Sequence, residues 1–360
     1  MEAVPSCFTF KSPQCSNIFT TQTTYSTGSS PESVKGVDVN GDGKPDIIVA
    51  NFGSNNVGVL LNIGNGTFAA QTTYSTGAGP VEVAAADVNG DGKPDIIVAN
   101  LNSNNVGVLL NTGSGTFSAQ TTYSTGIMPG AVAAPDVNDD GKPDFIVANY
   151  LSNNVGVLLN IGSGTFAAQT TYLTGTGPSE VAAADVNGDG KPDIIVSNYR
   201  SNNVSVLVNA GNGTFLTQKT YLTGSGPACV TAADVNGDGT PDIIVTNNLS
   251  NDVSVLVNAG NGTFLTQTTY LTGSAPVVVA TADVNGDNKP DIIIANSGSN
   301  NVGVLLNTGN GTFAAQVTYS TGSGSNPYCV TTADINGDNK PDIIIANSGS
   351  NNIGVLLDYC

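Results

Sequence analysis

One nine-residue string constrains this chain more than any other feature, because it occurs seven times. The string Asp-Val-Asn-Gly-Asp-Gly-Lys-Pro-Asp first spans residues 38–46. It returns with few substitutions from Asp87, Asp136, Asp185, Asp234, Asp283 and Asp334. The first five steps are 49 residues long and the last is 51. Such a period indicates one supersecondary unit copied in tandem, so fold and function should both be properties of an array.

Four strand-like segments fill each repeat. In the second repeat they are residues 81–88, 95–101, 106–111 and 116–125, each rich in β-branched side chains and bounded by Gly, Asn, Ser or Pro. The Gly-Asn-Gly or Gly-Ser-Gly tract between the third and fourth segments suits a tight hairpin, and no segment has a helical period. Seven such units predict an all-β fold, a seven-bladed β-propeller with four antiparallel strands per blade.

The two ends of the chain predict a closed ring. The last repeat stops after its third strand, and residues 19–28 (FTTQTTYSTG) match the fourth strand at residues 68–77 (FAAQTTYSTG). We therefore expect the N-terminal segment to complete the last blade and remove the exposed edges of an open array. The chain is therefore expected to consist of an N-terminal extension, residues 1–18, and a single propeller, residues 19–360.

The cysteines extend the same register. Cys15 and Cys360 both align with the hairpin turn that the termini cut open, so a disulfide between them would close the ring covalently. It would stabilise the fold by about 4 kcal/mol or more in the chain-entropy model. The alternative is two free thiols. Cys229 and Cys329 share another column with one blade between them, which predicts small buried or channel-facing residues, and Cys7 has no evident partner.

The repeated loop has the composition of a calcium site. Asp at positions 1, 5 and 9, Asn at position 3 and the carbonyl of residue 7 offer five hard oxygen ligands, which suits calcium better than magnesium. About seven calcium ions, one per blade, are expected. The alternative is a metal-free hairpin rich in Asp and Asn, in which three crowded carboxylates would repel one another. The predicted ligands are Asp38, Asn40, Asp42, Lys44, Asp46; Asp87, Asn89, Asp91, Lys93, Asp95; Asp136, Asn138, Asp140, Lys142, Asp144; Asp185, Asn187, Asp189, Lys191, Asp193; Asp234, Asn236, Asp238, Thr240, Asp242; Asp283, Asn285, Asp287, Lys289, Asp291; Asp334, Asn336, Asp338, Lys340 and Asp342.

Charge and hydropathy narrow the classes of partner. Three acids in each of seven loops account for most of the 28 Asp and Glu, so the net charge of −18 comes mainly from the predicted calcium ligands. Seven divalent cations would bring fourteen positive charges and leave −4. Ten scattered Lys and Arg argue against nucleic acid. The sequence has no apolar run long enough to cross a bilayer, so membrane insertion is not expected either.

These loops resemble the FG-GAP and VCBS repeats of integrin α-subunit-like propellers, in which a D-x-D/N-x-D-G-x-x-D loop joins the first two strands of a blade. The resemblance covers residues 19–360 and implies calcium bound on one face and ligand recognition on the other. The chain departs from integrins because every blade carries the loop and the Phe-Gly and Gly-Ala-Pro signatures are not clear.

Strand order places the candidate ligand face opposite the calcium loops. The connections between strands two and three, and from blade to blade, share that face, and substitutions among the repeats concentrate there. Bulky side chains on this Asn-, Ser- and Gly-rich surface predict a binding patch. The alternative is drifted loops with scattered apolar residues. The candidate ligand-binding residues are Phe52, Leu101, Met128, Tyr150, Tyr199 and Arg200.

Together these features predict a monomeric, non-catalytic calcium-binding propeller for extracellular recognition or adhesion, with a protein or glycan ligand. The alternative is a multivalent lectin. The chain has no histidine, so no catalytic residue is assigned and no enzyme is expected. A third hypothesis is a carboxylate-dependent glycan-active enzyme that uses Glu82 and Glu180, which share a first-strand column. We expect an extracellular or cell-surface location, although the first twenty residues lack the pattern of a secretion signal.

Overall fold

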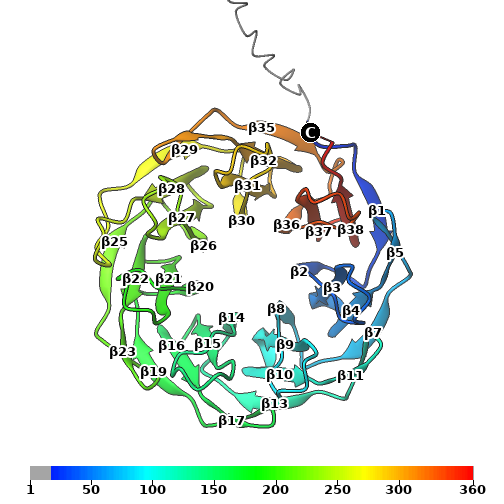
Figure 1. Ribbon diagram of the computed structural model, residues 1–360, viewed down its shortest axis with the longest axis horizontal. Coiled ribbons are helices and arrows are strands. Elements are labelled where there is room, and N and C mark those ends of the chain that lie inside the picture. The colour runs from blue at the N-terminus through cyan, green and yellow to red at the C-terminus, as the bar shows by residue number, and fades with distance from the viewer. Residues whose placement is uncertain (1–17, 360) are drawn as a thin grey trace, which may run out of the picture.

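A computed structural model describes residues 18–359, which form a ring of seven four-stranded antiparallel sheets. The sheets stand like blades around a central opening, and the first strand of each blade lies nearest the centre (Figure 1). The prediction of a seven-bladed all-β propeller is confirmed. We number the blades one to seven by the order of their first strands along the chain.

The strands are short and recur at matching positions. The first strands are β2 (Pro31–Val37), β8 (Pro80–Ala86), β14 (Pro129–Ala133), β20 (Pro178–Ala184), β26 (Pro227–Ala233), β30 (Pro276–Ala282) and β36 (Pro327–Ala333). The second strands are β3 (Asp46–Asn51), β9 (Asp95–Asn100), β15 (Phe145–Asn149), β21 (Asp193–Asn198), β27 (Asp242–Asn247), β31 (Asp291–Asn296) and β37 (Asp342–Asn347). The third strands are β4 (Asn56–Leu60), β10 (Asn105–Leu109), β16 (Asn154–Leu158), β22 (Asn203–Leu207), β28 (Asp252–Leu256), β32 (Asn301–Leu305) and β38 (Asn352–Leu356). The outer strands are β7 (Thr72–Ser75), β13 (Thr121–Ser124), β19 (Thr170–Leu173), β25 (Lys219–Leu222), β29 (Thr268–Leu271), β35 (Val317–Ser320) and β1 (Thr23–Ser26).

Smaller elements join these strands. Five short hairpins each pair a three-residue strand with a two-residue strand. They are β5 (Asn62–Gly64) with β6 (Thr67–Phe68), β11 (Asn111–Gly113) with β12 (Thr116–Phe117), β17 (Asn160–Gly162) with β18 (Thr165–Phe166), β23 (Asn209–Gly211) with β24 (Thr214–Phe215), and β33 (Asn307–Gly309) with β34 (Thr312–Phe313). Two single 3-10 turns, η1 (Phe52–Ser54) and η2 (Leu101–Ser103), follow the second strands of blades one and two.

The second strands form the centre of each sheet and are buried on both faces. Every residue of β9 is buried, and Ile96, Ile97 and Val98 have no exposed surface. This explains their continuous apolar composition, because each face packs against the sheet of a neighbouring blade. The core is therefore seven similar clusters, one in each gap between blades.

The prediction of one continuous fourth strand over residues 116–125 is wrong. This segment is divided into β12 and β13, and the residues between them leave the sheet. The side chain of Gln120 turns inward over Gly107 and fills the space that a Cβ atom there would need. Its Oε1 accepts a hydrogen bond from Asn100 Nδ2 at 3.4 Å. Blades four and five have Ser205 and Ser254 at this position, and the hydroxyls of these serines donate to Gln218 and Gln267. A small residue in the third strand thus accompanies the inward glutamine and the break in the outer strand, which β-propensity alone did not indicate.

The N-terminal strand closes the ring as predicted. β1 pairs antiparallel with β38 of the last blade, with Thr23 opposite Val355 and Ser26 opposite Asn352. Tyr25 continues a contact that every blade repeats, since its ring packs edge-on against Phe68 of the next blade at 5.3 Å between centroids. Closure therefore uses the same interactions that join the other blades.

Two further expectations concern the cysteines and the membrane. Cys229 and Cys329 are free and buried, as predicted for their column. Cys7, Cys15 and Cys360 lie outside the described residues, so the Cys15–Cys360 disulfide stays a prediction. Within residues 18–359 no helix has the length and hydropathy needed to span a membrane.

Candidate functional site

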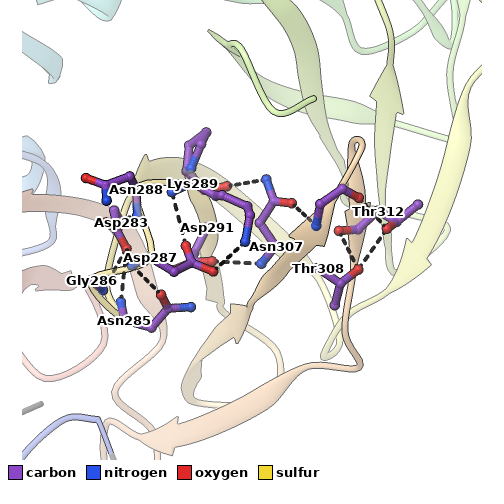
Figure 2. Close-up of polar contacts among 12 residues, drawn as sticks. Asp283, Asn285, Gly286, Asp287, Asn288, Lys289, Asp291, Asn307, Thr308 and Thr312 are labelled. Atoms are coloured by element: carbon purple, nitrogen blue, oxygen red, sulfur yellow. Dashed lines mark hydrogen bonds and ion pairs between the residues drawn. The ribbon is translucent and has the colours of Figure 1, made fainter. Parts of the chain in front are cut away.

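Each repeated loop folds around the carboxylate of its first aspartate, as the sixth loop illustrates (Figure 2). Oδ1 of Asp283 accepts hydrogen bonds from the amides of Gly286 at 2.8 Å and Asp287 at 3.1 Å, and Oδ2 accepts one from Asn288. Asn288, at position 6 of the loop, has a φ of +62°, and the first five loops have glycine there, so this position takes residues that tolerate the left-handed region. The first aspartate thus organises the loop backbone.

The last aspartate ties the loop to the rest of its blade. Asp291 is fully buried, and one of its oxygens accepts a hydrogen bond from the amide of Asn307 at 2.7 Å (Figure 2). Its other oxygen accepts one from the amide of Val284 at 3.0 Å. Burial raises the pKa of Asp291 to about 6, although these two hydrogen bonds oppose the shift. Each oxygen keeps a second lone pair, so these hydrogen bonds leave capacity for a cation.

The middle aspartate faces solvent and pairs with the lysine two residues later. Lys289 Nζ lies 2.9 Å from Asp287 Oδ2, and four other loops repeat this ion pair at 2.8 to 3.9 Å. Among residues 18–359 no three Asp, Glu, His or Cys side chains converge as a metal cage. The oxygen donors suit calcium by their chemistry, but the loops as folded use them for their own amides and lysines. Calcium would have to displace the lysine and draw the carboxylates together.

A recurrent asparagine that the sequence reasoning missed links neighbouring loops. Asn307 Nδ2 donates to the carbonyl of Pro290 in its own blade at 3.1 Å and to that of Val235, in the preceding blade's loop, at 2.9 Å. The same bridge joins five other pairs of loops. The signal was the Asn that opens every Asn-x-Gly hairpin in the described repeats except the last, where Asp358 stands. These bridges connect each of six blades to the loop of the preceding blade.

The opposite face opens into a central cavity of about 880 Å³. Four of the six predicted ligand-face residues, Leu101, Met128, Tyr150 and Tyr199, line it. Arg200 lies beside them, with its guanidinium 4.8 Å from the centre of the Tyr150 ring. Phe52 lies next to Gly79 at the junction with blade two. The ring therefore gathers the substituted connections around one opening.

Charged side chains concentrate in this cavity. Glu32, Glu82 and Glu180, which are all the glutamates in residues 18–359, line it together with Lys35. Glu82 comes from β8 of blade two and Glu180 from β20 of blade four, and their carboxyls are within hydrogen-bonding reach of each other. Catalytic pairs in glycosidases are about 5 to 9.5 Å apart. The geometry therefore does not support the glycosidase role suggested for this pair.

The cavity shifts the pKa of each of these groups. Burial raises the pKa of Glu32 and of Glu82 to about 7. Burial, followed by the charge of Glu82, raises the pKa of Glu180 well above its usual range. For Lys35 burial alone would lower the pKa, but nearby acidic groups, Glu82 foremost, outweigh it and raise the pKa. Burial and the proximity of the two carboxyls therefore both favour a protonated form of the pair.

This pair should destabilise the fold as pH rises. The folded-state pKa of Glu180 exceeds the unfolded value of 4.5, so the unfolded chain loses this proton first as pH rises. The free energy of unfolding therefore falls as pH increases from the unfolded toward the folded pKa. We expect Glu180→Ala, which restores the residue of blade three, to raise the melting temperature by about 2 °C or more at pH 8 and to change it little at pH 5. Melting curves at fixed calcium would measure this. Asp252→Asn is a matched charge change outside the cavity, and parallel curves for both variants would contradict the prediction.

Solved structures with the same fold have diverse functions. A virginiamycin B lyase from Staphylococcus aureus is 14% identical, with a TM-score of 0.67 over 94% of this chain and 99% of that one. A putative 6-phosphogluconolactonase from Bacteroides fragilis is 17% identical, with a TM-score of 0.62 over 81% and 85%. An Agrocybe aegerita lectin that recognises non-reducing terminal N-acetylglucosamine is 22% identical, with a TM-score of 0.55 over 84% and 81%. Comparison with curated proteins gave no match.

These likenesses correct one expectation. The sequence reasoning excluded an enzyme because the chain has no histidine and its acids are concentrated in the loops. The exclusion was wrong, because propellers of this shape include a lyase and a putative lactonase. At these identities the likeness shows the fold alone, so it assigns neither a reaction nor its absence.

The repeats themselves match a family. Six overlapping segments, residues 38–98, 87–147, 136–196, 185–245, 234–294 and 283–345, match the description FG-GAP-like repeat. Each segment begins at one aspartate loop and ends just beyond the start of the next repeat, so the matches together span most of the propeller. The chain therefore belongs to the family of FG-GAP-like repeat proteins.

Proposed function

We propose that this protein is an extracellular or cell-surface recognition propeller that binds a glycan at the mouth of its central cavity, with calcium in its loops supporting the ring. The observation that carries the proposal is the gathering of Tyr150, Tyr199 and Met128 with polar side chains around one cavity of about 880 Å³. Concave sites with aromatic walls and a few polar groups suit small or terminal ligands. A flat protein partner would make less use of such a depth.

The tyrosines give the mouth its capacity for sugars. A phenol ring offers an apolar face together with a hydroxyl that can donate or accept a hydrogen bond, which matches the mixed surface of a saccharide. Tyr150 also carries the Arg200 guanidinium against its ring, which adds donors at the rim. Blades five to seven have Asn248, Ser297 and Ser348 at the same positions, and blade seven contributes Tyr328 to the cavity from its first strand instead.

Calcium would act at the other face. In the sixth loop Asp283, Asn285, Asp287, the Lys289 carbonyl and Asp291 would hold the ion, and its charge would neutralise the crowded carboxylates. Support comes from the seven copies of the acid pattern and from the bridges that connect one loop to the next. In this proposal calcium rigidifies the ring without contacting the ligand.

A glycan array read with and without EDTA would test the proposal. We expect saturable binding that weakens at least tenfold in Tyr199→Asn, which installs the residue that blade five uses and should therefore fold. Tyr359→Ala removes an exposed tyrosine distant from the cavity and should bind as the wild type does. Absence of sugar binding by the folded, calcium-loaded protein would contradict the proposal and favour the alternative, adhesion to a protein partner.

A further inference from the structure

The near identity of the seven repeats shows which cavity residues the fold does not require. The column of Glu82 and Glu180 is otherwise filled by Ser33, Ala131, Cys229, Val278 and Cys329. The column of Lys35 is otherwise filled by Ala84, Ala133, Ala182, Thr231, Ala280 and Thr331. Five or six sister blades therefore fold with small uncharged residues where these three carry charge. A buried charge costs stability, so its presence in single blades indicates a use other than folding.

The three charged side chains offer a ligand two different kinds of contact. The carboxyls of Glu82 and Glu180 lie together and provide hydrogen-bond acceptors from blades two and four. Lys35 of blade one projects into the same cavity, and within residues 18–359 its ammonium has no hydrogen bond or ion pair. The cavity therefore has paired acceptors and, within reach of their charge, a lysine whose donors are unused. A ligand that carries both an ammonium and hydroxyl groups would satisfy both.

Resting on the glycan-binding function proposed above, we propose that the cavity selects an amino sugar, whose ammonium binds between Glu82 and Glu180 and whose hydroxyl oxygens accept from Lys35. An N-acetylated sugar of the same shape lacks the charge and would leave Lys35 as the only positive charge of the described chain near the carboxyl pair. The tyrosines at the mouth would contact the following sugars of the chain. The ligand class is thus an oligosaccharide with a terminal residue bearing a free amine.

The charge balance of the cavity favours a cation. Burial raises the pKa of all three glutamates, so the cavity becomes negative only as they ionise. When all are ionised, three glutamates face one lysine, and one further positive charge reduces the imbalance. The titratable groups that face the pair across the cavity are Glu32, Lys35, Cys229, Cys329, Tyr199 and Tyr328. In the free protein a shared proton lowers the charge of the pair from −2 to −1, because burial raises the pKa of both carboxyls. An arriving ammonium would displace that proton into solvent.

The test is a calorimetric titration with two probes that differ only at the amine. A chitosan tetramer carries free amines, and the fully N-acetylated tetramer does not. At pH 6.5 we expect the chitosan tetramer to bind at least tenfold more tightly, and to release protons, measured in two buffers of different ionisation enthalpy. Glu180→Gln should weaken chitosan binding at least tenfold and abolish the proton release, while binding of the N-acetylated tetramer changes less than twofold.

Control variants separate the inference from the function on which it depends. Asp252→Asn removes one negative charge outside the cavity and installs the residue of the other blades, so it should keep the preference. Glu180→Ala, with the residue of blade three, provides a second variant if Glu180→Gln does not fold. Equal affinity for the two tetramers overturns the inference and leaves glycan binding intact. Binding of neither by folded protein overturns the inference, and the glycan array then shows whether the proposed function fails with it.

Discussion

Removing calcium with EDTA is expected to lower the melting temperature of this propeller by more than about 10 °C. A ligand that binds only the folded state stabilises it by about 2.7 kcal/mol per site at a hundredfold excess over its dissociation constant. Seven such sites would contribute about 19 kcal/mol, which greatly exceeds the effect of one ordinary mutation. Scanning calorimetry in calcium and in EDTA measures the difference directly. An unchanged melting temperature would show that the carboxylates are held by the loop amides and lysines alone.

Substitutions within the third loop provide the matched control for calcium. Asp140 is a predicted ligand, whereas the neighbouring Asp139 stands at position 4, where the other six loops have glycine. Asp140→Asn should lower the melting temperature in calcium and have little effect in EDTA. Asp139→Gly removes the same charge and restores the common residue at a φ of +62°, so it should not lower the melting temperature in either condition. Equal effects of both variants would indicate charge repulsion rather than metal binding.

Deleting the closing strand is expected to have the other large effect. A chain that begins at residue 29 lacks β1, so the edge of β38 is exposed and the Tyr25–Phe68 and Phe19–Tyr319 ring contacts are lost. We expect the melting temperature to fall by more than about 10 °C and the protein to associate through the free edge. Calorimetry and size-exclusion chromatography under reducing conditions would measure both. A chain that begins at residue 18 keeps β1 and should behave as the full chain does. If the two shorter chains behave identically, β1 does not stabilise the closed ring.

Closure of the ring could be predicted because a repeat supplies its own reference. The match of residues 19–28 to residues 68–77 identified a displaced outer strand, and the structure pairs it with β38 as expected. The divided outer strand was not predicted. Its residues have continuous β-propensity, and only the structure shows that Gln120 turns inward over the third strand where the outer strand is interrupted.

The candidate sites differ in the same way. The aspartate loop lies within nine residues, so its first and last members could be placed on a tight turn from spacing alone. The asparagine that bridges Val235 and Pro290 was missed because its partner carbonyl belongs to a different blade. Glu82 and Glu180 were recognised as one column, but nothing in the sequence showed that they meet, or that Lys35 shares their cavity.

The amino-acid sequence by itself determined the repeating unit, the number of blades, the loop that each blade carries and the strand that closes the circle. These are local or periodic properties, and seven near-identical copies repeat the same information. Only the tertiary structure decided that Glu82, Glu180 and Lys35 face one another beneath Tyr150 and Tyr199. Residues on different blades approach only when the ring closes around its centre, and the size of the central cavity depends on how all seven sheets pack.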